Sequence, residues 1–104
     1  LHFEKINPQR YPCLPLAIKV AKQGGAAPAV LNGANETVVT AFLEEEIHFV
    51  EIAETIAAVI KDFEKALHQV DVPPFLRKIS TLEDAEHADK WGRKQASKIL
   101  ESII

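Results

Sequence analysis

The stretch from Ala27 to Leu43 constrains the fold of this chain more than any other part of its sequence. Its apolar residues recur at steps of three and four, which is the period of a helix with one buried face. That face would carry Ala27, Leu31, Ala34, Val38, Ala41 and Phe42. Pro28 suits the first turn, because the N–H group that proline lacks has no helical partner there. The sequence therefore predicts a helix over residues 27–43.

Three residues inside this helix are poor helix formers. Asn32, Gly33 and Asn35 together cost about 2 kcal/mol relative to alanine. Asn32, Asn35 and Glu36 share one flank, because positions three and four apart are neighbours on a helix, while Gly33 has no side chain to keep another backbone away. Two interpretations follow: a close helix crossing whose two amides bond to neighbouring backbone, or a polar stripe that contacts a substrate or a metal.

Two further helices are expected around this one. Prolines mark the approach to the first, which we expect from about Pro15 to Gln23, where Gly24 and Gly25 stop it. The other, from about Val50 to Gln69, has the clearest amphipathic pattern in the chain. Its apolar stripe consists of Ile52, Ile56, Val59, Ile60, Phe63 and Leu67.

The last third of the chain predicts a loop and a closing helix. Pro73 and Pro74 exclude a continuous helix through residues 70–79. Ser80 and Glu83 have the spacing of a capping box, which starts a helix that runs from 81 to about 102. We expect its buried edge, interrupted by Gly92, to contain Leu82, Ala85, Ala88, Trp91, Ala96, Ile99 and Ile103.

Composition limits the possible functions. A chain of 104 residues is expected to form one domain with a modest core. Its formal charge of −3 argues against nucleic-acid binding, which needs a clustered positive face. The single cysteine, Cys13, has no internal partner and favours a reducing compartment. No apolar run approaches the roughly 20 residues that cross a bilayer, so we expect no membrane partner.

The residues contain no complete active site. No glycine-rich phosphate-binding loop is present, and Cys13 has no evident base to activate it. The four histidines share no metal-ligand spacing. Glu44 with His48, and Glu83 with His87, stand four apart but lack a third ligand. We therefore expect no catalytic, cofactor-binding or metal-ligating residue in this chain.

One segment resembles a known family. The run Ala-Pro-Ala-Val-Leu-Asn-Gly-Ala-Asn-Glu at residues 27–36 resembles the A-P-A-V-L-N-A-A-N-E signature of the 1-deoxy-D-xylulose 5-phosphate reductoisomerase family. The agreement extends in register to residues 3–5, to residues 10–14 and to Ile47 with Phe49. The match is to the C-terminal quarter of that enzyme. It implies an all-α fold, a small bundle of about four helices over residues 13–104, preceded by an extended arm or linker at residues 1–12.

The resemblance also implies a function for the whole enzyme. Enzymes of this family use NADPH and Mg²⁺ or Mn²⁺ to convert 1-deoxy-D-xylulose 5-phosphate to 2-C-methyl-D-erythritol 4-phosphate in non-mevalonate isoprenoid biosynthesis. They act as homodimers in the bacterial cytoplasm or in a plastid-type organelle. The family's cofactor domain, metal-binding carboxylates and substrate loop precede the matching region. This chain is then inactive alone and braces the catalytic domain through Asn32, Gly33, Asn35 and Glu36, the residues we expect at the interdomain contact.

Two other functions remain open from the residues alone. A stand-alone helical protein-interaction module would have a satisfied N-terminus, whereas a detached domain would leave the arm, with Phe3, Ile6 and Tyr11, without its packing partner. A metal-sensing bundle would show a thermal shift with Zn²⁺ or Mn²⁺ that His48→Ala or His87→Ala abolishes. We expect no such shift.

Overall fold

The computed structural model describes residues 25–104, and all regular structure in this part is helical. The elements are α2 (Ala27–Leu43), α3 (Phe49–Leu67), the one-turn α4 (Pro74–Arg77) and α5 (Leu82–Ile103). The all-α fold is therefore confirmed. The predicted arm at residues 1–12 and the predicted helix before Gly24 lie outside the described residues.

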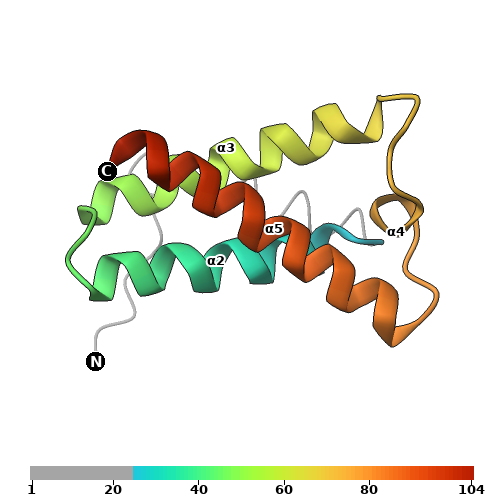
Figure 1. Cartoon of the computed structure of the whole chain (residues 1–104), viewed down its shortest axis with the longest axis horizontal. Coiled ribbons are helices and arrows are strands. Elements are labelled where there is room, and N and C mark those ends of the chain that lie inside the picture. Colours follow the sequence, from blue (N-terminus) through green and yellow to red (C-terminus); the bar gives the residue numbers. More distant parts are fainter. Residues whose placement is uncertain (1–24) are drawn as a thin grey trace, which may run out of the picture.

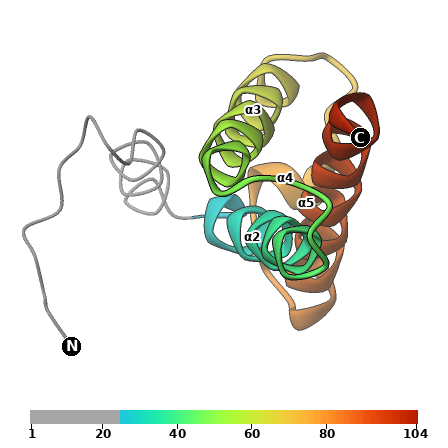
Figure 2. The same cartoon turned by 90° about the vertical axis from the view of Figure 1, so that its left-hand side faces the viewer.

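The three long helices pack around one core. α2 and α3 run antiparallel side by side, and α5 crosses them obliquely (Figure 1). Seen from the end, α2, α3 and α5 surround a common interior, while α4 lies beside α5 (Figure 2). α5 contacts both of the other long helices, so it holds the antiparallel pair together.

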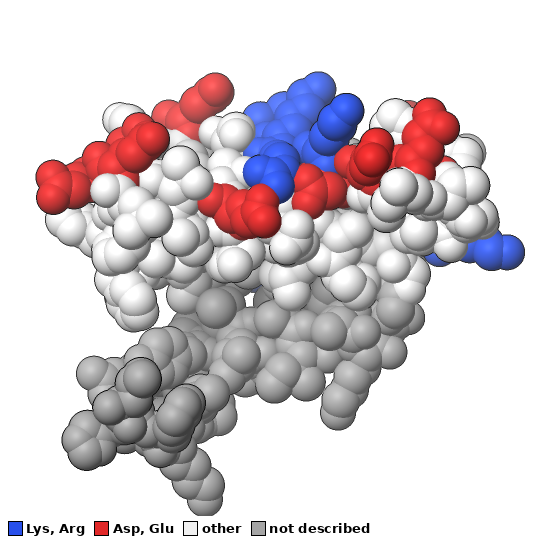
Figure 3. Space-filling view, turned by 90° about the horizontal axis from the view of Figure 1, so that it is seen from below, with Lys and Arg blue, Asp and Glu red and all other residues white. Residues whose placement is uncertain are grey.

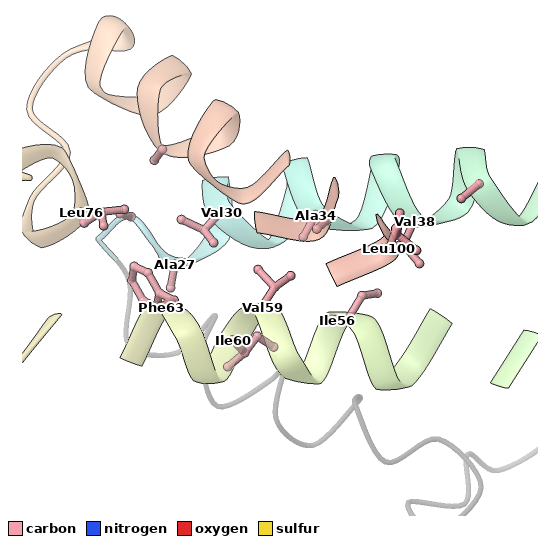
Figure 4. Close-up of a cluster of buried hydrophobic side chains, with 14 of the residues drawn as sticks. Ala27, Val30, Ala34, Val38, Ile56, Val59, Ile60, Phe63, Leu76 and Leu100 are labelled. Carbon is pink, nitrogen blue, oxygen red and sulfur yellow. The ribbon is translucent and has the colours of Figure 1, made fainter. Parts of the chain in front are cut away.

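The core is mainly aliphatic, with Phe63 as its one fully buried aromatic residue among those described, and comes from all four helices (Figure 4). The α3 stripe is confirmed: Ile56, Val59, Ile60 and Phe63 are buried, and Ile52 and Leu67 are partly buried. The predicted buried face of α2 is confirmed, although Leu31 and Phe42 are only partly buried. Val30, which was not predicted, is buried as well. Trp91 of α5 packs its ring edge-on against Phe63, with centroids 6.1 Å apart, as expected of a core side chain.

The loop expected at residues 70–79 contains one helical turn. α4 begins directly after Pro73, with Pro74 in its first turn, where a missing N–H costs nothing. The turn places Leu76 in the core with 1% of its surface exposed. α3 already ends at Leu67, before the two prolines, which permit a new helical turn at Pro74.

Two glycines mark the crossing of α2 and α5. A Cβ atom on Gly33 would lie 2.1 Å from the carbonyl oxygen of Asp89, and a Cβ on Gly92 would lie 2.1 Å from the carbonyl oxygen of Val30. Real Cβ atoms essentially never approach so closely, so both positions need glycine at this helix separation. The close crossing expected at Gly33 is confirmed. The prediction that Gly92 interrupts the buried edge of α5 is wrong, because Gly92 is itself a buried contact.

The start of α5 differs by one residue from the prediction. Thr81, not Ser80, is the N-cap: its hydroxyl accepts from the Asp84 N–H at 3.1 Å, and Asp84 Oδ2 accepts from the Thr81 N–H at 3.2 Å. The Asp84 carboxylate also accepts from the N–H of Ser80 at 3.0 Å. These bonds lower the pKa of Asp84. The helix therefore begins at Leu82, which is 78% exposed rather than buried, because this first turn lies before α5 reaches the core.

Gly33→Leu tests the crossing. Leucine gains about 1 kcal/mol in helix propensity, but its side chain forces apart two backbones that are in contact, and overpacking costs about 1–3 kcal/mol. We expect a net loss in the free energy of unfolding, measured by chemical denaturation. The matched control is Asn35→Leu, which adds the same side chain at an exposed position of the same helix and gains the propensity without a clash. A more stable Gly33→Leu protein would contradict the crossing.

Candidate functional site

Polar side chains of α2 and α5 form a connected network beside the glycine crossing. Asn32 Nδ2 donates to Asp89 Oδ2 at 3.0 Å, and Arg93 Nε donates to Asp89 Oδ1 at 2.5 Å. Arg93 also forms an ion pair with Glu36. Two of the four predicted interdomain residues therefore bond to α5: Asn32 to Asp89, and Glu36 to Arg93.

The charges of the network stabilise one another. Partial burial would by itself raise the pKa of Asp89, but hydrogen bonds from Arg93 and Asn32 outweigh it and hold the pKa below its ordinary value. Hydrogen bonds to Asp89 and Glu36 in turn raise the pKa of Arg93. Asp89 and Arg93 therefore stabilise each other's charged forms, and the guanidinium of Arg93 engages the carboxylates of both Asp89 and Glu36.

The predicted site residues have different environments. Gly33 is buried under α5, so its contact is within the chain. Asn32 bonds to the carboxylate of Asp89, which corrects the expectation that both amides bond to backbone. Asn35 is exposed and forms no hydrogen bond with any of residues 25–104. Of the predicted stripe, then, Asn35 is the residue whose side chain the described domain does not use.

Sequence reasoning missed Asp89 and Arg93 as partners of the stripe. A signal was available, since the two residues are four apart and flank Gly92, so they share one side of α5 with the residue that permits close approach. What the sequence lacks is any indication that α5, rather than another helix, crosses α2 at Gly33.

A shallow hollow of about 630 Å³ opens between α2 and α5 next to the network. Figure 3 shows basic side chains gathered in the middle of this side of the molecule, with acidic ones on either side. The lining combines small apolar residues with the charged groups of the network: Pro28, Ala29, Asn32, Ala85, Glu86, Asp89, Lys90 and Arg93.

The two glutamate–histidine pairs singled out in the sequence do not form a metal site among the described residues. Glu83 and His87 lie 3.5 Å apart on the surface of α5. α2 ends at Leu43, so Glu44 and His48 do not share a helix, and His48 instead precedes α3 as its N-cap. Within residues 25–104, no three side chains of histidine, cysteine, aspartate or glutamate come together as metal ligands. Nor does any helix in this part of the chain have the length and apolar character to cross a membrane.

These features define a small helical domain with an ordered polar edge between α2 and α5. Residues 1–95 match the protein family described as the DXP reductoisomerase C-terminal domain, and the chain belongs to that family. The resemblance in the signature at residues 27–36 is thereby confirmed.

Individual relatives agree with this assignment. The chain is 41% identical to 1-deoxy-D-xylulose 5-phosphate reductoisomerase of Microcystis aeruginosa over 100 residues, covering 96% of this chain and 23% of the relative. The enzyme of Proteus mirabilis is 36% identical over 104 residues, again 23% of its length. The solved structure of the Zymomonas mobilis enzyme in complex with NADPH superposes with a TM-score of 0.74 at 37% identity, covering 97% of this chain and 24% of that one. The chain therefore spans about a quarter of the length of these relatives. The alternative of a stand-alone module without enzymatic relatives does not agree with these matches.

A double-mutant cycle on Asp89→Asn and Arg93→Gln measures the network. We expect a coupling of about 0.5–1 kcal/mol at pH 7, since the side chains are 24% and 42% exposed and water screens the pair. The folded-state pKa of Asp89 lies below its unfolded value of about 3.9. The coupling is thus fully present above that value and is lost as the pH falls through the folded-state pKa.

The pair Glu83 and His87 is the control for this cycle. It has the same spacing on the same helix, but its side chains are 80% and 50% exposed. We expect a coupling near zero at pH 7. Equal couplings for the two pairs would mean that the Asp89–Arg93 contact is an ordinary surface pair.

Proposed function

We propose that this chain is the C-terminal quarter of a reductoisomerase that converts 1-deoxy-D-xylulose 5-phosphate to 2-C-methyl-D-erythritol 4-phosphate, in non-mevalonate isoprenoid biosynthesis. The observation that carries this proposal is the match of nearly the whole chain, in sequence and in fold, to a quarter of an enzyme solved with NADPH. In the proposal the complete enzyme is a homodimer in the cytoplasm of a bacterium or in a plastid-type organelle.

In this proposal the cofactor and the metal are held by polypeptide outside this chain. The carboxylates on the α2–α5 edge do not fit a metal, because Asp89 and Glu36 are both engaged by Arg93, and residues 25–104 offer no other cluster of ligands. NADPH and Mg²⁺ or Mn²⁺ would then act in the preceding domains, and the role of this chain is to hold their geometry.

The proposed bracing contact is the exposed flank of α2. Asn35 offers an amide donor and acceptor that no described residue uses. Its neighbours Asn32 and Glu36 are fixed by α5, and Gly33 lets α5 lie close enough to fix them. A surface whose side chains are already ordered loses little entropy on binding, which suits it to a permanent interdomain contact.

The catalytic assignment has a direct test. The isolated chain, mixed with NADPH, 1-deoxy-D-xylulose 5-phosphate and Mn²⁺, is expected to oxidise no NADPH. A chimera in which this chain replaces the matching quarter of the Zymomonas mobilis enzyme is expected to oxidise it, as followed by absorbance. Turnover by the isolated chain, or a folded chimera without turnover, would contradict the proposal.

Asn35→Arg tests the bracing contact. In the isolated chain we expect no change in melting temperature, because the position is exposed. In the chimera we expect a loss of about 1–3 kcal/mol, since a bulky charge enters a packed contact. Glu54→Arg, which introduces the same residue at an exposed position of α3, is the control and leaves both proteins unchanged. Equal effects of Asn35→Arg on chain and chimera would exclude a contact at this flank.

A further inference from the structure

One asparagine of the chain is followed directly by glycine, namely Asn32 before Gly33. Asparagine is a chemically labile residue, and it is most labile before glycine, which has no side chain to obstruct its own backbone nitrogen. The other two asparagines precede proline and glutamate: Asn7 and Asn35. The pair at residues 32 and 33 is therefore the position in this sequence where the backbone most readily attacks an asparagine side chain.

The reaction of such a pair is deamidation through a cyclic imide. The backbone nitrogen of Gly33 gives up its proton and bonds to Cγ of Asn32, and the side-chain nitrogen of Asn32 leaves as ammonia. Water then opens the imide at one of its two carbonyl carbons, which leaves aspartate or isoaspartate at position 32. The reaction consumes only water, so it needs no cofactor and no second protein.

The folded backbone opposes this attack. In an α-helix the N–H of each residue bonds to the carbonyl four positions back, and Gly33 lies well inside α2. Its nitrogen is therefore directed along the helix and away from the Asn32 side chain. An added Cβ atom on the buried Gly33 would lie 2.1 Å from the carbonyl oxygen of Asp89, so α5 leaves the chain no room to rotate at this point.

The side-chain amide is held as well. Asn32 Nδ2 donates to Asp89 Oδ2 at 3.0 Å, which keeps the amide on the side of α5. Asn32 is nevertheless exposed, so water reaches it. What limits the reaction is the freedom of the backbone, and that freedom requires α5 to move away from α2. The rate of deamidation then follows how often the crossing opens locally.

Conversion places a negative charge where the network has a donor. A carboxylate at position 32 has no proton to donate and repels the carboxylate of Asp89. Glu36, one turn further along α2, already pairs with Arg93, so three carboxylates would share one guanidinium. Isoaspartate would in addition insert an extra backbone carbon into α2 and interrupt its hydrogen bonds. Both products therefore oppose renewed closure of the crossing.

We infer that Asn32 and Gly33 form a deamidation site that the α2–α5 crossing protects. The site reacts when the crossing opens, and its product then hinders the crossing from closing. The change is one-way, because the released ammonia is not returned to the side chain. This inference goes beyond the proposed function and does not depend on it, since it concerns the chain by itself.

Peptide mass spectrometry tests the site. The chain is kept in mildly alkaline buffer with and without unfolding concentrations of urea, and the replacement of NH₂ by OH at Asn32 is followed over time. We expect conversion in the folded chain to be slower by about tenfold or more, because only the opened state reacts. Asn35, which is exposed in the same helix but precedes glutamate, is the internal control and converts slowly in both conditions.

Gly33→Ala in urea tests the chemistry without the fold. The added methyl group obstructs the attacking nitrogen, so conversion at Asn32 is expected to be slower than in the unaltered chain. No conversion of the unaltered chain in urea would show that the pair is not a deamidation site. Equal rates with and without urea would show that the fold gives no protection, and either result overturns the inference.

Two variants of α5 test the role of the crossing. Gly92→Ala introduces a Cβ atom 2.1 Å from the Val30 carbonyl oxygen, and Asp89→Ala removes the acceptor of Asn32 without adding bulk. We expect conversion at Asn32 in the folded proteins to be about fivefold faster, as for the loss of one net hydrogen bond. In urea all variants should match the unaltered chain. Lys98→Ala, at an exposed position of α5, is the control and changes neither rate.

Circular dichroism establishes which variants are folded. If Gly92→Ala is unfolded, Asp89→Ala decides the result. Folded variants that convert at the rate of the unaltered chain would show that α2 alone protects the site, which overturns the role of the crossing.

The consequence of conversion is tested by Asn32→Asp. We expect a melting temperature lower by about 4–8 °C, the shift that accompanies the net loss of one hydrogen bond in a domain of this size. The matched control is Asn35→Asp, which makes the same change at an exposed position of the same helix and leaves the melting temperature unchanged. Equal melting temperatures for the two variants would show that conversion does not disturb the crossing.

Discussion

The backbones of α2 and α5 approach each other most closely where Gly33 faces the Asp89 carbonyl and Gly92 faces the Val30 carbonyl. The contact is reciprocal, since each helix contributes one glycine and one carbonyl. Leucine-sized residues would hold the helices apart and leave the small residues Ala34, Ala88 and Ala96 without contact. Instead all three are buried. The position of α5, and with it the closure of the core over α2 and α3, follows from this crossing.

The same approach determines which polar groups meet. Asn32 and Glu36 of α2 reach Asp89 and Arg93 of α5 because the helix axes are close at Gly33. The network at the edge is thus a consequence of the crossing and also a reinforcement of it, although partly exposed ion pairs contribute modestly. Residues that look like a binding stripe in the sequence are largely used inside the domain, and the side chain left over is Asn35.

A domain of this kind acts through its surfaces. Its described residues hold neither a cluster of metal ligands nor an unengaged pair of carboxylates in the polar network. What it does offer is a polar flank of α2 whose side chains are fixed by α5. The chain spans about a quarter of its reductoisomerase relatives.

The sequence by itself predicted the three long helices of the described part, most of their buried residues and, through a resemblance, the family. The α2 bounds, the α3 stripe and the need for a close crossing at Gly33 can all be predicted, because periodicity and helix propensity are local properties. Where two local solutions compete, sequence is less decisive: Ser80 with Glu83 and Thr81 with Asp84 both suit a helix start, and the structure uses the second.

Only the tertiary structure decided which helix crosses α2 at Gly33. Because that helix is α5, Gly92 is a contact and not an interruption, and Asn32 bonds to Asp89. The tertiary structure also decided that Leu82 stays outside the core. The glycine contacts and the Asn32–Asp89 bond join residues more than 50 positions apart, and Asn32 and Asp89 are separated by 57. Such pairings are set by how complementary surfaces pack, and a local pattern in one helix carries no information about its partner.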